Sequence, residues 1–214
     1  GSHRLAVQAV NLFVLDMAAG RVYQLTLNES GEGVVEKSEA PTRAYRTQAV
    51  NERQVGNLTD LVWMPVGGTR TRASLVILDS GGLLDYDLAW NLRSIAIGQG
   101  PPPLSARAIA GFGGNLYVLD ASPTQTQVWR YMPLGDGYGS QAKPYFEPPP
   151  ADLLNVIDLA IDGNVYLLQD NGRIRKFFGG PEKPFTVAGL NEPLKRPVAL
   201  AVDSEARKNT LYVA

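Results

Sequence analysis

The sequence predicts an all-β protein of the β-propeller type, and three observations carry that prediction. A strand–turn–strand pattern recurs along the 214 residues. Further short apolar strands flank each copy, which gives four strands per unit, and no stretch of helical periodicity separates the strands. Repeats of about 40 to 50 residues with four strands are typical of propeller blades. A β-sandwich with coincidental spacing is the alternative.

The second strand of each unit defines the repeat. It reads NLFVLD, SLVILD, NLYVLD and NVYLLQ in the four full copies, and TLYVA ends the chain. The polar residues that close the four copies are Asp16, Asp79, Asp120 and Gln169. We expect these residues to accept or donate hydrogen bonds at the turns, once per blade, because short polar side chains commonly satisfy turn amides.

The flanking strands complete the units. Candidate first strands begin at Leu5, Leu58, Ala106, Val156 and Pro197, and candidate fourth strands begin at Ser94, Pro144 and Phe185. Residues 28–56 should hold the fourth strand of the first unit and then a long loop. We therefore expect about five units in residues 4–214, as an incomplete part of a propeller of six or more blades, after a tag remnant at residues 1–3.

The segments VIDLAIDGNVYLLQDNGRIRKF and PVALAVD…NTLYVA resemble NHL-type six-bladed propellers. QVWRYMP and GRIRKFFGG add a narrower similarity to the extracytosolic propeller modules of bacterial membrane signalling proteins, namely receptor kinases and metal-dependent protein phosphatases. The unit at Leu58 departs from the pattern, with VWMPVGGTRTRASLVILD in place of a tight turn. The resemblance implies a ligand-sensing or protein-binding domain without catalysis of its own.

Composition excludes several function classes. Twenty basic and 21 acidic side chains leave a net charge of -1, which offers no field for nucleic acid or an anionic membrane. The chain has no cysteine, and its single histidine, His3, lies in the tag remnant. Thiol and histidine-based nucleophilic sites are therefore excluded. Glycine pairs lie between strands rather than before helices, so no phosphate-binding loop is predicted.

Carboxylates beside the first strands suggest one possible metal site. Asp60, Asp158 and Asn155 lie next to such strands in two units, and hard oxygen ligands suit Ca²⁺ or Mg²⁺. The resemblance to lactonase-like six-bladed propellers implies a divalent cation on the axis, although the acidic ligand of the first blade in that family has no counterpart here. The competing interpretation is that these side chains cap turns.

Aromatic residues are the candidate ligand or partner contacts. The residues in question are Trp63, Trp129, Tyr131, Tyr138 and Tyr145. Tryptophan and tyrosine are enriched at binding hot spots, and the last two lie in or beside a long loop at residues 135–152. Packing between blades is the competing interpretation.

Together these observations predict a non-catalytic binding or sensor module that recognises a protein, peptide or glycan through propeller loops. The signalling resemblance implies the extracytoplasmic side of a bacterial membrane, with a membrane-tethered parent, and a cytoplasmic location is the alternative. We expect no nucleic-acid partner, no membrane insertion of this chain and no cofactor. A metal-dependent hydrolase with an axial divalent cation and a structural assembly scaffold are the alternative functions.

Overall fold

The structure is a computed structural model of the chain. It describes residues 3–8, 11–30, 33–39, 49–50, 53–54, 56–80, 82–87, 92–98, 105–189, 192, 194–203 and 210–214. Residues 40–48 of the predicted long loop lie outside the described residues.

Four antiparallel four-stranded sheets form four blades, and the prediction of an all-β propeller is confirmed. Blade 1 contains β1 (His3–Gln8), β2 (Asn11–Asp16), β3 (Arg21–Leu27) and β4 (Val34–Glu39). Blade 2 contains β7 (Leu58–Met64), β8 (Ser74–Asp79), β9 (Gly82–Tyr86) and β10 (Leu92–Ser94). A short hairpin of β5 (Ala49–Val50) and β6 (Arg53–Gln54) lies between them in sequence.

The other two blades repeat this order. Blade 3 contains β11 (Ala106–Phe112), β12 (Asn115–Asp120), β13 (Gln127–Tyr131) and β14 (Lys143–Pro144). Blade 4 contains β15 (Val156–Ile161), β16 (Val165–Gln169), β17 (Ile174–Phe177) and β18 (Glu182–Lys183). A fifth sheet pairs β19 (Leu200–Asp203) with β20 (Thr210–Val213).

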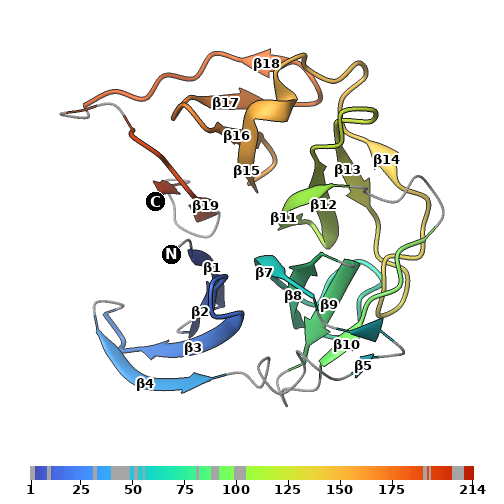
Figure 1. The fold of residues 1–214 in the computed structure, drawn as a ribbon, viewed down its shortest axis with the longest axis vertical. Helices are drawn as coiled ribbons and strands as arrows, with labels where there is room; N and C mark the ends of the chain where they lie inside the picture. Colours follow the sequence, from blue (N-terminus) through green and yellow to red (C-terminus); the bar gives the residue numbers. More distant parts are fainter. Residues whose placement is uncertain are drawn as a thin grey trace.

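The blades surround a common axis, with the first strand of each sheet innermost (Figure 1). The inner strands contact one another in chain order, from β1 through β7, β11 and β15 to β19. One apolar core fills the space between each pair of neighbouring sheets, so four cores hold the described blades together. Inter-blade burial of apolar side chains is the main stabilising term of this architecture.

Burial along the second strands shows how many neighbours each blade has. All six residues of β8 and all five of β16 are buried, because these blades are covered on both faces. In β2 and β20, by contrast, more and less buried positions alternate. One face of blade 1 accordingly exposes Leu5 and Val7, which are 44% and 61% accessible. Whether a further blade covers this face stays a prediction.

The hydrogen bonds expected of the strand-closing polar residues are confirmed. An Asp16 carboxylate oxygen accepts from the Ala19 N–H, and Asp79 accepts from the Gly56 N–H. Asp120 accepts from the N–H groups of two serines, Ser105 and Ser122. The amide of Gln169 instead donates to the Asp152 carboxylate, which exchanges the roles of donor and acceptor in blade 4.

The predicted fourth strands are wrong in position by one to three residues. The sequence suggested starts at Ser94, Pro144 and Phe185, whereas β10, β14 and β18 begin at Leu92, Lys143 and Glu182. These outer strands are short and exposed or half-buried, so little apolar periodicity marks them. The single described helical element is a 3-10 turn, η1 (Leu153–Asn155). In the described ranges, no helix has the length and apolar character needed to cross a membrane.

Candidate functional site

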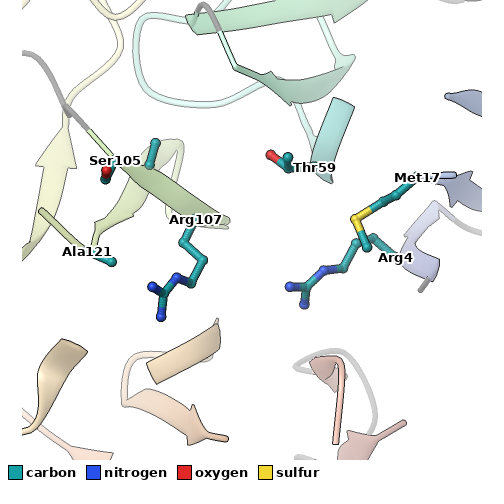
Figure 2. Close-up of a pocket in the computed structure, with 7 residues that line it drawn as sticks. Arg4, Met17, Thr59, Ser105, Arg107 and Ala121 are labelled. Carbon is teal, nitrogen blue, oxygen red and sulfur yellow. The ribbon is translucent and has the colours of Figure 1, made fainter. Parts of the chain in front are cut away.

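A pocket of about 380 Å³ opens beside the axis, at the end where the inner strands begin. Its lining residues come from blades 1, 2 and 3, and they are Arg4, Met17, Thr59, Ser105, Ala106, Arg107 and Ala121. Figure 2 shows the guanidinium groups of Arg4 and Arg107 pointing into the same space. We call this space the axial pocket. Among the described residues that line it, these two arginines are the ionisable ones.

Irregular pairing at the start of three inner strands shapes the axial pocket. The register shifts by one residue at Thr59 in β7, at Arg107 in β11 and at Ile157 in β15. A β-bulge of this kind bends the strand and re-aims one side chain. Two of the three bulged residues, Thr59 and Arg107, line the pocket.

Arg4, which lines the pocket, forms a buried ion triad with Asp60 and Asp158, neither of which is among the lining residues. The Arg4 guanidinium lies 2.5 Å from the Asp158 carboxylate and 3.9 Å from that of Asp60. It also donates to the Ile157 carbonyl oxygen at 3.2 Å. The triad therefore joins strand β1 to β7 on one side and to β15 across the axis.

Backbone amides occupy the remaining positions around both carboxylates. Asp60 accepts from the Leu61 and Ile109 N–H groups at 2.9 and 2.7 Å. Asp158 accepts from the Leu159 and Leu200 N–H groups at the same two distances. Each carboxylate thus links its own inner strand to the next one.

Burial raises the pKa of both aspartates of the triad. Burial raises the pKa of Asp60 to about 6, against the opposing effect of Arg4. Burial and the neighbouring Asp60 raise the pKa of Asp158 to about 8. Near neutral pH the triad therefore carries less negative charge than two ionised carboxylates would give it.

Arg107 differs from Arg4 because its partners are uncharged. Its Nη1 donates to the carbonyl oxygens of Leu154 and Val156, at 2.9 and 2.7 Å, at the start of blade 4. No carboxylate among the described residues forms an ion pair with Arg107. Nε and Nη2 make no hydrogen bond within the described chain and are not among its buried unpaired atoms. One edge of the guanidinium therefore remains available.

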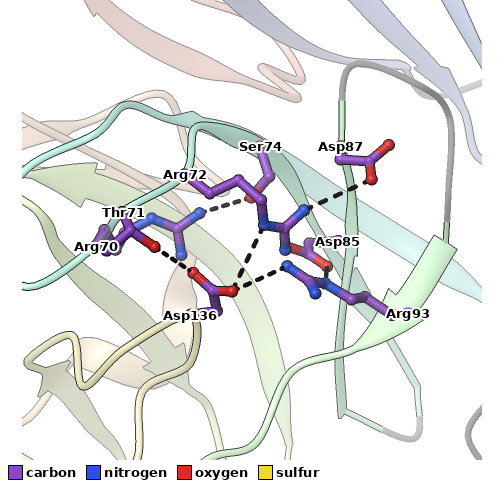
Figure 3. Close-up of polar contacts among 8 residues, drawn as sticks. All are labelled: Arg70, Thr71, Arg72, Ser74, Asp85, Asp87, Arg93 and Asp136. Carbon is purple, nitrogen blue, oxygen red and sulfur yellow. Dashed lines mark hydrogen bonds and ion pairs between the residues drawn. The ribbon is translucent and has the colours of Figure 1, made fainter.

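A second charged group lies at the other end of the blades, where loops of blades 2 and 3 meet (Figure 3). We call it the blade 2–3 ion cluster, and it contains Arg70, Arg72, Arg93, Asp85, Asp87 and Asp136. Asp85 is fully buried, and its two carboxylate oxygens lie 2.6 Å from Arg72 Nη2 and 3.1 Å from Arg93 Nε. Asp136, from the β13–β14 loop, lies 3.6 Å from Arg93 and 3.9 Å from Arg72.

The backbone supports this junction of two loops. Ile97 and Tyr138 form a parallel β-bridge between blades 2 and 3. At Gly98 a Cβ atom would lie 1.9 Å from the Gly139 carbonyl oxygen, so only glycine allows this approach. The blade 2–3 ion cluster is therefore part of a close contact between blades.

The structure separates the predicted metal-site residues. Asp60 and Asp158 face the axis, as expected, but Arg4 lies between them. Asn155 belongs to η1 and its side chain is exposed, whereas both aspartates are 4% accessible. Among the described residues, no group of three acidic or histidine side chains is arranged to hold a metal ion. The Ca²⁺ or Mg²⁺ expectation stays a prediction.

The five predicted aromatic contacts lie in or against the cores between blades. Trp63 stacks on Phe13 in the core of blades 1 and 2, with 5.7 Å between ring centroids. Tyr131 and Tyr138 are fully buried in the core of blades 2 and 3, against which Trp129 packs.

The fifth aromatic residue, Tyr145, packs against the core of blades 3 and 4. It makes an edge contact with Phe146, with ring centroids 4.8 Å apart. This is the placement that the packing interpretation expects, and none of the five lines the axial pocket. Their role in binding a partner stays a prediction.

Sequence reasoning did not identify Arg4 or Arg107. Arg4 pairs with Leu15, the residue before a strand-closing aspartate, and Asp60 and Asp158 occupy the same repeat position in their blades. An alignment of the first strands on the strand-closing residues puts Arg4 at the repeat position that Asp60 and Asp158 occupy in blades 2 and 4. The bulge that directs Arg107 has no comparably clear signal.

Comparisons with known proteins establish the fold. No protein-family model and no curated protein matches the chain. A solved nidogen/laminin complex contains a chain that matches with a TM-score of 0.63 and 13% identity, over 100% of this chain and 71% of that one. PorZ, a surface component of the type-IX secretion system of Porphyromonas gingivalis, matches with a TM-score of 0.52 and 14% identity, over 95% and 28%. At such identities, the likeness shows that the chain has a β-propeller fold.

Proposed function

We propose that the chain is a non-catalytic binding module that recognises a protein, peptide or glycan at the axial pocket. The observation that carries this proposal is the Arg107 guanidinium, which borders an open pocket and has an unused hydrogen-bonding edge. Concave sites with a few directed polar groups are the usual form of ligand pockets. Three blades contribute to this one, so its shape depends on the folded ring.

The side chains around the pocket favour binding over proton-transfer chemistry. General acid–base catalysis needs a side chain that exchanges protons near the working pH. The lining residues that the structure describes supply two arginines, two hydroxyl groups and apolar side chains, and none of these has a carboxylate, imidazole or amine. The nearby carboxylates of Asp60 and Asp158 do not line the pocket and are already bonded to Arg4 and to backbone amides.

The proposal extends to the biological setting that the sequence resemblance implied. A sensor or protein-binding module on the extracytoplasmic side of a bacterial membrane, within a signalling protein, would use such a pocket to detect its ligand. The support for this setting is the NHL-like pattern of residues 156–214 and the similarity to propeller modules of signalling proteins.

A pair of matched variants tests the proposed function. Ser105 is exposed at the pocket, and Val66, which is 61% accessible, follows β7 at the opposite end of the axis. Ser105→Trp should fill part of the pocket, whereas Val66→Trp introduces the same side chain far from it. Labelled wild-type and variant proteins are applied to peptide and glycan arrays.

We expect some of the peptides or glycans on the arrays to bind the wild type and Val66→Trp but not Ser105→Trp. Binding that is unaffected by Ser105→Trp, or lost in Val66→Trp alone, would contradict a role for the axial pocket. Circular dichroism of the variants verifies that each retains the β-sheet fold.

A further inference from the structure

We propose that the axial pocket takes a carboxylate group and that Arg107 is the residue that binds it. This inference rests on the proposed function, because it names the chemistry of the ligand at the same pocket. The ligand is a carboxylate-bearing molecule, either a small organic acid or the acidic group of a peptide.

The Arg107 guanidinium has an edge whose N–H groups form no hydrogen bond within the described chain. A guanidinium carries five N–H donors in a fixed plane. The two contacts to the Leu154 and Val156 carbonyl oxygens both involve Nη1. Nε and Nη2 form the other edge of the plane, and this edge matches the two oxygens of a carboxylate in a bidentate pair. The Leu154 and Val156 contacts also fix the plane before a ligand arrives.

The charge around that edge also favours an anionic ligand. No acidic residue is found in the described part of the pocket lining, so no lining side chain there competes for Arg107. The nearby strand-closing Asp120 is fully buried and accepts from two backbone N–H groups, Ser105 and Ser122. Arg4 is balanced by the aspartates beneath it, which leaves Arg107 as the uncompensated cation of the pocket.

The free edge of Arg107 suits a carboxylate better than a phosphate. One free guanidinium edge supplies one positive charge and two parallel donors, which a singly charged carboxylate satisfies. A phosphate dianion needs further donors and a second compensating charge. Ser105 adds one exposed hydroxyl, and Met17 and Ala121 provide apolar surface for the carbon atoms next to the carboxylate.

Isothermal titration calorimetry on the whole chain tests the inference with four probes. Glutarate represents a small acid, and Ac-Ala-Ala-Ala with a free carboxyl terminus represents a peptide. The same peptide with an amidated terminus replaces the carboxylate with a neutral amide, and inorganic phosphate supplies the competing anion. We expect the free peptide or glutarate to bind at least tenfold more tightly than both the amide and phosphate.

Variants then connect the binding to Arg107. Arg107→Gln should weaken carboxylate binding at least tenfold, because charge-assisted bonds to a guanidinium are strong. Arg107→Lys retains the charge without the planar edge, and we expect an intermediate loss. Arg130→Gln is the matched control, since Arg130 lies on β13 of the same blade and does not line the pocket. It should bind as the wild type does.

Each result decides the inference. Tighter binding of the free peptide than of glutarate assigns a peptide source, and the reverse assigns a small acid. Equal binding of peptide and peptide amide, preferred binding of phosphate, unchanged affinity in Arg107→Gln, or no binding of any carboxylate would overturn it. If an array ligand is lost in Ser105→Trp but retained in Arg107→Gln, the carboxylate inference fails while the proposed function stands.

Discussion

The blade 2–3 ion cluster and the axial pocket both contain several arginines, but they use them differently. In the cluster, Arg72 and Arg93 each contact the buried Asp85 and also face Asp136. In the axial pocket, Arg107 has only carbonyl partners in the described chain. The first arrangement pairs Arg72 and Arg93 with carboxylates of the protein, whereas the second leaves the Nε and Nη2 donors of Arg107 available.

The comparison suggests how structural and ligand-binding arginines can be distinguished in this fold. A buried guanidinium is costly unless it is paired and hydrogen-bonded. Arg4 and Arg72 are paired with carboxylates of other strands or loops and thereby connect blades. Arg107 meets it only in part, and its free edge borders the pocket.

Removing the cation of the buried triad should cause the largest loss of stability. Arg4→Met leaves Asp60 and Asp158 buried without a counterion, and breaking a buried pair in this way costs about 3–5 kcal/mol. Urea unfolding followed by circular dichroism measures the change in free energy of unfolding. Arg173→Met, at an exposed arginine, is the control and should cost less than about 1 kcal/mol. Equal losses in both variants would contradict a structural role for the triad.

The central carboxylate of the blade 2–3 ion cluster should affect stability without affecting ligand binding. Asp85→Asn removes the negative charge that Arg72 and Arg93 share. Because the arginine side chains are 23% and 40% exposed, we expect a loss of about 1–3 kcal/mol. Carboxylate affinity at the axial pocket should equal that of the wild type. A large loss of affinity with the fold intact would show that the two regions are not independent.

The triad also predicts a pH dependence. The folded-state pKa of Asp158, at about 8, lies above its ordinary value of 3.8, so the folded protein holds a proton that the unfolded chain releases. The stabilisation is present below pH 4 and is lost as the pH rises to about 8, at up to about 1.4 kcal/mol per pH unit for one proton. Comparing thermal unfolding of the wild type and Asp158→Asn across this range isolates the contribution. Parallel curves for the two proteins would contradict the raised pKa.

The smallest expected loss of stability belongs to Arg107. Arg107→Gln removes the bonds to the Leu154 and Val156 carbonyl oxygens, for which we expect about 1 kcal/mol, well below the effect of Arg4→Met. The same urea experiment measures it. A loss as large as that of Arg4→Met would place Arg107 with the structural arginines and remove the contrast between the two regions.

The sequence predicted the fold better than the site because different physical features determine them. The NLFVLD-type strands repeat along the chain and lie in the cores between blades, so their pattern was visible without coordinates. The short outer strands β14 and β18 bury little apolar surface, and their positions were missed.

At the site, the sequence placed Asp60 and Asp158 near the axis but not the cation between them. The contact of Arg4 with Asp158 joins residues 154 positions apart and exists only because the ring brings β1 opposite β15. The free edge of Arg107 likewise depends on a bulge and on two carbonyl groups of the next blade. Neither the Arg4–Asp158 contact nor the free edge of Arg107 can be deduced from the spacing of residues in the sequence.

The most direct test of the central claim is the ¹H–¹⁵N NMR signal of the Arg107 Nε–H during a titration with glutarate. The signal can be assigned by its absence from the spectrum of Arg107→Lys. We expect it to shift and saturate as glutarate is added, while the Nε–H signals of Arg72 and Arg93 remain in place. An unchanged Arg107 signal, or equal shifts of all three arginines, would contradict carboxylate binding by the free guanidinium edge.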